Sequence, residues 1–178
     1  MVSFCARTVS RTRKSNNSPT EVSYVAHQFL LDAMLGSLAR WLRIGGIDSE
    51  YRRDIEDEEL IKEAQNTGRI LLTRDSVLVQ RAKKHCVDAF FIPFIKDREI
   101  LRLLIKVYAL ELDAEKSRCP KCNGTLRSIQ REKAKPRVPE GTWINAFEFW
   151  ECLLCGSVYW RGSHWENISS TIVYAMQP

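Results

Sequence analysis

Hydrophobic residues from position 29 to 112 follow two patterns that alternate along the chain. Short continuous apolar runs predict buried strands at residues 29–31, 70–73 and 89–92. Apolar residues at helical spacing predict helices at residues 33–44, 57–67, 76–84 and 97–112. Strands that alternate with helices over short connections are typical of a mainly parallel sheet with helices on both faces. We therefore predict an α/β fold for this part of the chain.

Two aspartates follow predicted strands at their carboxyl ends. Asp32 comes directly after the run at 29–31, and Asp75 comes shortly after the run at 70–73. Ligands of parallel sheets bind outside the carboxyl ends of the strands, so these carboxylates converge if the two strands are neighbours. Asp57 opens the intervening helix and can approach the same edge. Three clustered carboxylates need a cation to neutralise them, and magnesium or manganese suits hard oxygen ligands.

Each aspartate also has a simpler structural interpretation. All three stand next to a predicted helix start, where Asp is a favoured N-cap. The acidic run at 54–59 also suits a solvated first helical turn that complements the helix dipole. The pattern alone leaves both interpretations open. Candidates for phosphate contact near this edge are Arg40, Arg43 and Arg74, although Arg40 and Arg43 equally fit a solvated helix face.

Two Cys-x-x-Cys pairs in the C-terminal part have the spacing of a four-thiolate zinc site. The four candidate ligands are Cys119, Cys122, Cys152 and Cys155. The alternatives are a pair of disulfides or a thioredoxin-like redox pair, but a redox motif normally stands alone and no secretory segment is expected. We therefore predict a structural zinc ion, which replaces the core that so short a segment cannot build.

Basic and aromatic residues alternate around these cysteines, a composition that suits contact with single-stranded nucleic acid. Most of the aromatic residues are equally expected in the core of the small module. The basic stretch at 131–137 is predicted to be an exposed loop, and it is the better candidate for RNA contact. His164 is expected to pack or form hydrogen bonds, because four cysteines already complete a zinc shell.

Composition adds little about partners. The chain has 178 residues and a net charge of +5, but the tail at 1–28 holds four basic residues and one acidic residue and so supplies three of those charges. This tail is predicted to be a disordered basic arm or an upstream extension, with an organelle transit peptide as the alternative. No run approaches the ~18 apolar residues that span a bilayer, so we expect a cytoplasmic protein with no membrane partner.

The motifs together resemble the Mut-7 C-terminal RNase family. The resemblance rests on residues 29–32, 36–48, 57–60 and 68–75, and it continues through both cysteine pairs and the segment at 159–164. It implies a PIN-like nuclease domain at 29–115 and a zinc ribbon of antiparallel strands at 116–168, followed by a C-terminal tail at 169–178. It also implies metal-dependent cleavage of RNA.

Residues of the family motif carry over individually. Asp32, Asp57 and Asp75 match its acidic positions, which implies that they are catalytic and bind magnesium or manganese. Many PIN-like nucleases have a further acid two residues after the last of these, where this chain has Val77. This departure puts a fixed two-metal site in doubt, and Asp54 or Asp97 are the candidates to compensate.

The resulting functional hypothesis is a ribonuclease in which metal-activated water hydrolyses a phosphodiester bond of single-stranded RNA. The ribbon would serve as a structural and RNA-binding accessory. One alternative is a noncatalytic RNA- or protein-binding adaptor on the same scaffold. Another is a toxin-like nuclease with a cognate inhibitor. The sequence identifies no protein partner.

Overall fold

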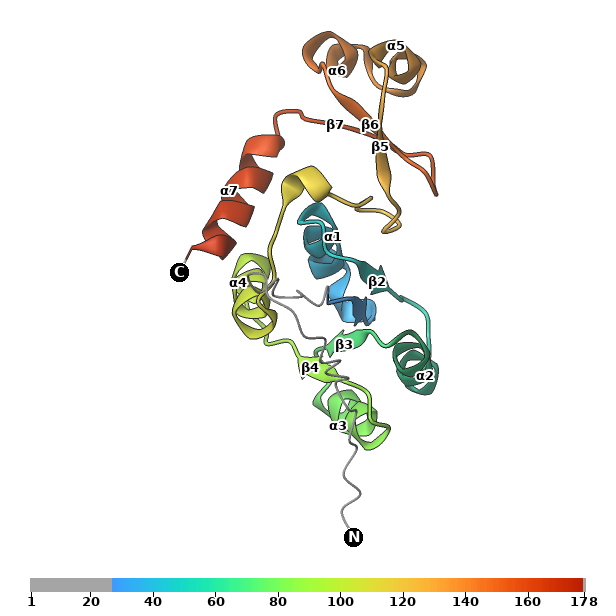
Figure 1. The fold of residues 1–178 in the computed structure, drawn as a ribbon, viewed down its shortest axis with the longest axis vertical. Helices are drawn as coiled ribbons and strands as arrows, with labels where there is room; N and C mark the ends of the chain where they lie inside the picture. Colours follow the sequence, from blue (N-terminus) through green and yellow to red (C-terminus); the bar gives the residue numbers. More distant parts are fainter. Residues whose placement is uncertain (1–26, 178) are drawn as a thin grey trace, which may run out of the picture.

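Four short strands form a parallel sheet at the centre of the N-terminal part (Figure 1). The structure is a computed structural model that describes residues 27–177, so the tail predicted for 1–28 lies almost entirely outside the described residues. The strands are β1 (Phe29–Leu31), β2 (Ser49–Tyr51), β3 (Ile70–Thr73) and β4 (Ala89–Phe91). Their order is β2-β1-β3-β4, and all three neighbouring pairs are parallel. The predicted mainly parallel sheet is confirmed.

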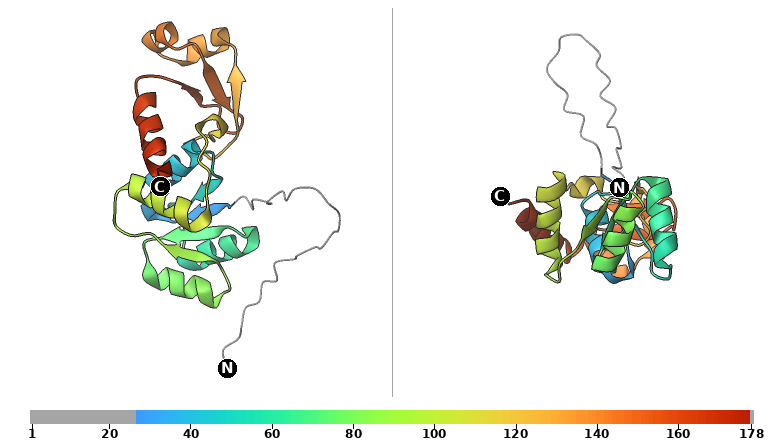
Figure 2. Two further views of the ribbon diagram at one scale, coloured as in Figure 1. Left: turned by 60° about the vertical axis from the view of Figure 1, so that its left-hand side comes forward. Right: turned by 90° about the horizontal axis from the view of Figure 1, so that it is seen from below.

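Helices cover both faces of this sheet. The helices of this part are η1 (Ala33–Leu35), α1 (Gly36–Ile44), α2 (Asp57–Thr67), α3 (Ser76–Lys84) and α4 (Asp97–Tyr108). Side chains alternate between the faces of a strand, so Phe29 and Leu31 pack with α1 and α4, whereas Leu30 packs with α2 and α3. The sheet is therefore the middle layer of three (Figure 2).

Two predicted elements differ in the structure. Residues 49–51, expected only as a connecting segment, form the edge strand β2, whose polar sequence lacks an apolar run because it lies at the border of the sheet. The helix predicted to continue to residue 112 ends at Tyr108. Ala109 adopts a left-handed conformation with a φ of 50°, which turns the chain so that Leu110 and Leu112 enter the core.

The C-terminal module contains the predicted antiparallel ribbon. It comprises η2 (Ala114–Lys116), β5 (Leu126–Ile129), α5 (Arg131–Ala134), η3 (Lys135–Arg137), α6 (Glu140–Asn145), β6 (Phe149–Cys152) and β7 (Val158–Trp160). The strands pair antiparallel in the order β5-β6-β7. The stretch at 131–137 was predicted to be an exposed loop. It is largely exposed, as predicted, but it is not a loop: it forms α5 and η3, and Ala134 is buried against Phe149.

Helix α7 (Trp165–Met176) follows the ribbon and returns to the N-terminal part. Figures 1 and 2 both show it beside α4. Ile172 and Ala175 are buried in the same core as β1, and the Tyr174 hydroxyl donates to Glu99 at 2.7 Å. The boundary expected between residues 168 and 169 thus falls inside a helix that joins the two parts. No helix within residues 27–177 is both long enough and apolar enough to cross a bilayer.

Candidate functional site

Thr73 links two of the predicted site residues at the carboxyl edge of the sheet, the edge where the parallel strands end. Its hydroxyl donates a hydrogen bond to the Asp32 carboxylate and accepts one from the Asp75 backbone N–H at 2.9 Å. Thr73 is fully buried at the end of β3, and β1 and β3 are neighbours in the sheet. The structure therefore places Asp32 and Asp75 side by side at this edge.

Both aspartates are also helix caps, as the simpler interpretation expected. Asp32, only 8% exposed, accepts the Met34 backbone N–H at 2.9 Å and caps η1. Asp75 is exposed and caps α3 by accepting the N–H groups of Val77 and Leu78 at 2.7 and 3.1 Å. One carboxylate oxygen of Asp75 takes all these bonds, so the other has no hydrogen-bond partner within residues 27–177. Capping and ligand binding are thus compatible for Asp75.

Asp57 is held differently. It is the first residue of α2 rather than its cap, and its carboxylate pairs with Arg81 of α3 at 2.8 Å. Arg81 also pairs with Glu58 at 3.0 Å. The Asp57 side chain is 46% exposed. This aspartate is therefore accessible, but in this conformation a cationic side chain already occupies one of its oxygens.

The three aspartates do not converge as closely as the cysteines do. Among the described residues, the four cysteines are the one group of three or more His, Cys, Asp or Glu side chains whose ligand atoms all lie within 4.8 Å of one another. The sheet edge thus brings Asp32 and Asp75 together around Thr73 and leaves Asp57 paired with Arg81.

A fourth carboxylate lies at the same edge. Asp97 follows β4 and starts α4, and it accepts a hydrogen bond from the Ser37 hydroxyl, near the start of α1, at 2.5 Å. Asp54, the other candidate for the missing fourth acid, is exposed in the loop before α2. Of the two, Asp97 has the better position, because the strand that precedes it, β4, is the neighbour of β3, which precedes Asp75.

Arg74 lies between the two edge residues Thr73 and Asp75. Its guanidinium lies 5.1 Å from the ring centroid of Phe94, which is itself 70% exposed. The Arg74 Nε is buried and has no hydrogen-bond partner among residues 27–177. A buried unpaired donor is costly, so this group is suited to an anionic oxygen supplied by a ligand.

The other two predicted phosphate contacts differ from one another. Arg40 is exposed on α1 and forms no hydrogen bond or ion pair with the described residues. Arg43 is 4% exposed, so the prediction that it contacts substrate or solvent was wrong. Its guanidinium donates to the carbonyl of Ser49 at 2.7 Å and to those of Pro120 and Lys121 at 3.1 and 3.3 Å. Burial lowers the pKa of this guanidinium.

The four cysteines form a second site in the ribbon. The Sγ atoms of Cys119 and Cys155 lie 3.7 Å apart, and those of Cys122 and Cys152 lie 3.4 Å apart. Sulfurs at the corners of a tetrahedron about zinc would lie ~3.8 Å apart for a Zn–S bond of about 2.3 Å. None of the four is in a disulfide. The residues present therefore fit a structural zinc ion.

The turns around the cysteines are shaped for this arrangement. The backbone N–H groups of Leu154 and Cys155 point to the Cys152 sulfur at 3.4 and 3.5 Å. A Cβ on Gly124 would lie 2.8 Å from the same sulfur, so glycine is required there for space. The residues in the left-handed conformation at these two turns are Gly156, with a φ of 70°, and Asn123, with a φ of 66°. Asn tolerates this conformation better than most residues.

Interactions around the cluster perturb the pKa values of the thiols. Hydrogen bonds from the side chain and backbone of Ser157 lower the pKa of Cys155 to about 6. Burial raises the pKa of Cys122 to about 12. The Tyr159 hydroxyl lies 3.1 Å from the Cys119 sulfur and can donate to it once it is a thiolate. A bound cation would stabilise all four thiolates together, because it removes the cost of placing like charges side by side.

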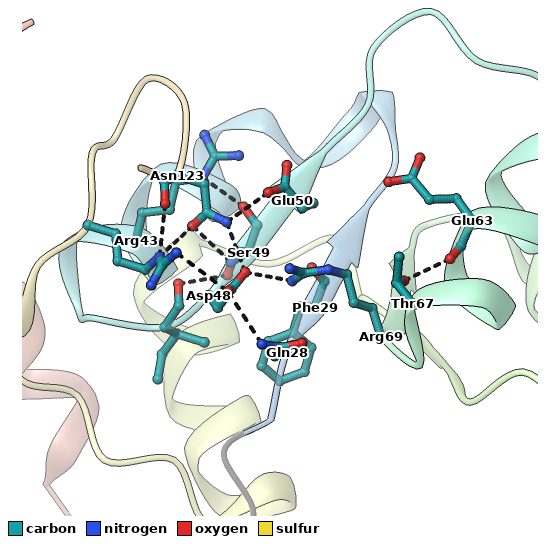
Figure 3. A network of polar contacts seen from close by, with 12 residues as sticks. Gln28, Phe29, Arg43, Asp48, Ser49, Glu50, Glu63, Thr67, Arg69 and Asn123 are labelled. Atoms are coloured by element: carbon teal, nitrogen blue, oxygen red, sulfur yellow. Dashed lines mark hydrogen bonds and ion pairs between the residues drawn. The ribbon is translucent and has the colours of Figure 1, made fainter. Parts of the chain in front are cut away.

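Asn123 connects the cysteine cluster to the parallel sheet (Figure 3). Its amide oxygen accepts from the Ser49 backbone N–H at 3.1 Å, and its amide nitrogen donates to Asp48 at 2.9 Å and Glu50 at 3.1 Å. Burial acts to raise the pKa of Asp48, but hydrogen bonds from Arg69 and Asn123 outweigh it, so this pKa lies below its usual value. Burial likewise acts to raise the pKa of Glu50, but hydrogen bonds from Asn123 and Arg52 outweigh it, so this pKa also lies below its usual value.

Sequence reasoning missed Thr73, Ser37 and Asn123. The position of Thr73 between an apolar strand and the Arg-Asp pair was a usable signal, because a hydroxyl at a strand end commonly bonds a neighbouring carboxylate. Asn123 stands directly after a cysteine pair, where Gly156 stands after the other, which indicates a left-handed position. The partners of these side chains come from distant segments, and no local pattern identifies them.

The fold and sites define a class: a parallel α/β domain with an acidic carboxyl edge, joined to a small antiparallel module with a four-cysteine cluster. The chain belongs to the Mut7-C RNAse domain family, whose model matches residues 27–172. This confirms the resemblance and implies a ribonuclease with RNA as its substrate. Neither a curated protein nor a solved structure matches the chain.

Proposed function

We propose that this protein is a divalent-metal-dependent ribonuclease that hydrolyses single-stranded RNA at the carboxyl edge of its PIN-like sheet. Family membership supports RNA as the substrate. The observation that carries the assignment to this edge is the placement of Asp32 and Asp75 on either side of the Thr73 hydroxyl. This edge is also where ligands of open parallel sheets generally bind.

The carboxylates have the donor chemistry of a magnesium or manganese site. Asp75 keeps one oxygen without a hydrogen-bond partner among the described residues, and so does Asp57. Asp32 and Asp75 would hold the ion, and Asp57 would join them by exchanging its contact with Arg81. Magnesium usually retains several waters, so it does not need a complete cage of protein ligands. When bound, the ion would activate a water molecule and stabilise charge on the phosphate oxygens.

The surrounding residues position the reacting groups. Thr73 and the Met34 N–H fix the Asp32 carboxylate, which is nearly buried and so holds a constant orientation. Arg74 offers its Nε to a phosphate oxygen, and Arg40 offers an exposed charge on α1; neither group has a hydrogen-bond partner in the described part of the chain. The four cysteines bind zinc, which holds the ribbon together and has no part in hydrolysis.

The direct test is cleavage of single-stranded RNA by the zinc-loaded protein with manganese. Asp75→Asn should lower the cleavage rate by at least about 100-fold, the scale of losing one charge-stabilising group at a reacting centre. Asparagine also caps helices, so this variant should fold normally. Asp88→Asn is the matched control, because Asp88 is exposed at the amino end of β4. Equal rates for parent and Asp75→Asn would refute the proposal.

A noncatalytic adaptor is the second candidate. The ion pair between Asp57 and Arg81, and the lack of a close three-carboxylate group among the described residues, favour it. Calorimetry with manganese separates the two functions. A nuclease should bind manganese in the parent and lose this binding in Asp75→Asn, whereas an adaptor should show no manganese binding that depends on Asp75.

A further inference from the structure

A cavity with a volume of about 240 Å³ lies where the ribbon, the start of α7 and the end of α1 meet. Four aromatic side chains line it: Trp150, Tyr159, Trp160 and Trp165. Two arginines, Arg118 and Arg161, complete its polar side. The cavity is smaller than the ~300–1,000 Å³ of a pocket for a drug-sized ligand, so it suits a single planar ring system.

One face of the ribbon sheet forms a wall of this cavity. Ser128, Trp150 and Tyr159 are direct cross-strand partners on β5, β6 and β7, so their side chains share a face. The opposite face carries Phe149, which is buried against α5 and α6. The ribbon thus builds its core on one face and leaves the indole and phenol rings of the other beside an open space. Trp160, although it also lines the cavity, is the cross-strand partner of Phe149 and so belongs to the opposite strand face.

Arg161 is held between two indole rings at this cavity. Its guanidinium carbon lies 5.3 Å from the ring centroid of Trp150 and 4.9 Å from that of Trp165. Arg161 also pairs with Glu115 and Glu148, whose side chains are 72% and 63% exposed. Exposed ion pairs are weak, so an incoming phosphate can replace these carboxylates without a large cost.

The exposed side of α1 connects this cavity with the acidic edge. Ser37, Arg40 and Ile44 are spaced i, i+3 and i+7 and therefore share one side of the helix. Ser37 bonds Asp97 at the carboxyl edge, and Ile44 lines the cavity. The distance along the helix is about 10 Å, at ~1.5 Å per residue. Arg40, which is exposed, lies between the two ends.

We propose that this cavity is a binding site for one unstacked nucleobase of single-stranded RNA, with Arg161 contacting the adjoining phosphate. The inference rests on RNA being the substrate, as proposed above. Aromatic rings and arginine planes are the surfaces on which proteins stack bases taken from single strands. The site would hold the RNA at a fixed distance from the acidic edge, with Arg40 contacting the backbone in between.

Binding can be measured separately from cleavage. All proteins carry Asp75→Asn, are full length and zinc-loaded, and are titrated into fluorescently labelled oligoadenylate and into an abasic strand of the same length. Adding Trp165→Ala, which removes an indole that lines the cavity beside Arg161, should weaken oligoadenylate binding about tenfold and leave abasic binding unchanged. Adding Ser128→Trp, which fills the cavity, should give the same loss. Phe147→Ala, which removes a 76% exposed aromatic outside the cavity, should have no effect.

The outcomes distinguish this site from the proposed activity. If the unsubstituted protein cleaves RNA but neither Trp165→Ala nor Ser128→Trp changes binding, the base site is wrong and the ribonuclease assignment stands. If the parent does not cleave but both variants lose binding, the base site stands and the ribonuclease assignment fails. If abasic and complete RNA bind equally, the base site is wrong. This is also the result expected if the cavity serves a protein partner. Thermal unfolding of each variant identifies any loss caused by misfolding.

Discussion

The amide oxygen of Asn123 accepts a hydrogen bond from the backbone N–H of Ser49 at 3.1 Å. Asn123 directly follows a cysteine of the metal cluster, and Ser49 begins β2, the edge strand of the parallel sheet. Edge strands carry unpaired backbone groups that a protein must satisfy or protect. A side chain of the ribbon therefore satisfies a backbone N–H at the edge of the parallel sheet, and Asn123 links the four-cysteine cluster to that sheet.

Replacing Asn123 should destabilise the protein through this contact. Asn123→Ala leaves the buried Ser49 N–H without this partner and removes one hydrogen bond each from the half-buried carboxylates of Asp48 and Glu50, so we expect the free energy of unfolding to fall by roughly 2–4 kcal/mol. Asn123→Gly loses the same contacts but accommodates the φ of 66° without strain. The glycine variant should therefore be more stable than the alanine variant by about 1 kcal/mol in chemical denaturation. A stable alanine variant would contradict this account.

Removal of zinc should loosen the edge of the sheet as well as the ribbon. The cluster positions Asn123, so chelation is expected to release its bonds to Ser49 and Glu50 of β2. Hydrogen exchange followed by mass spectrometry should show lost protection at Ser49–Tyr51. Helix α3 takes no part in the bonds to Asn123 and should keep its protection. Readdition of zinc serves as the control and should restore β2. Unchanged protection of β2 after chelation would show that the two parts are independent.

Apolar periodicity was sufficient to predict the buried layers of the fold. The runs at β1 and β3 are buried on both faces, so their residues had to be apolar, and helical spacing marked the helices that cover them. β2 was missed because only Ser49 of its three residues is buried, and an edge strand carries no apolar run. The end of α4 was misplaced because Leu110 and Leu112 continue the apolar pattern while the backbone turns at Ala109.

The candidate sites were predictable to the extent that their chemistry is local. The cysteine ligands lie in two short motifs with fixed spacing, so the sequence alone located them. The common placement of Asp32 and Asp75 was predictable because strand ends in a parallel sheet share an edge. The burial of Arg43 could not be predicted in this way. Its guanidinium bonds carbonyl groups of Pro120 and Lys121, far along the chain, and these contacts exist only after the two parts pack together.

Acid should weaken the contact between the two parts. The folded pKa values of Asp48 and Glu50 lie below the ordinary values of 3.8 and 4.5. Depressed carboxylate pKa values stabilise the fold above these ordinary values, and that stabilisation is lost as the pH falls through the folded pKa values. Asp48→Asn should therefore be less stable than the parent at pH 7, by roughly 1–3 kcal/mol, and the difference should shrink below about pH 4. Denaturation of both proteins at each pH measures it, with Asp88→Asn expected to show no such convergence.

Arg81 should compete with a divalent ion for Asp57. Arg81→Gln removes the positive charge 2.8 Å from the Asp57 carboxylate, and we expect manganese affinity to rise by about threefold. The effect is small because both side chains are more than a third exposed and solvent screens their interaction. Calorimetric titration of manganese into the zinc-loaded protein gives the affinity. The gain should vanish when Asp57→Asn is added; a gain that persists would show that Asp57 is no ligand.

Thr73→Val should separate the positioning of the acidic edge from its charge. Valine matches threonine in shape but leaves the Asp32 carboxylate and the Asp75 N–H without the buried hydroxyl, which should destabilise the protein by about 1–3 kcal/mol. Asp32 would lose one of its two orienting bonds, so cleavage in manganese should fall even where the protein is fully folded. Thr73→Ser keeps the hydroxyl and should retain cleavage close to that of the parent, despite a small cavity from the lost methyl group. Because both variants keep all the carboxylates, equal cleavage by the valine and serine proteins would show that Thr73 stabilises the sheet end without positioning Asp32 for hydrolysis.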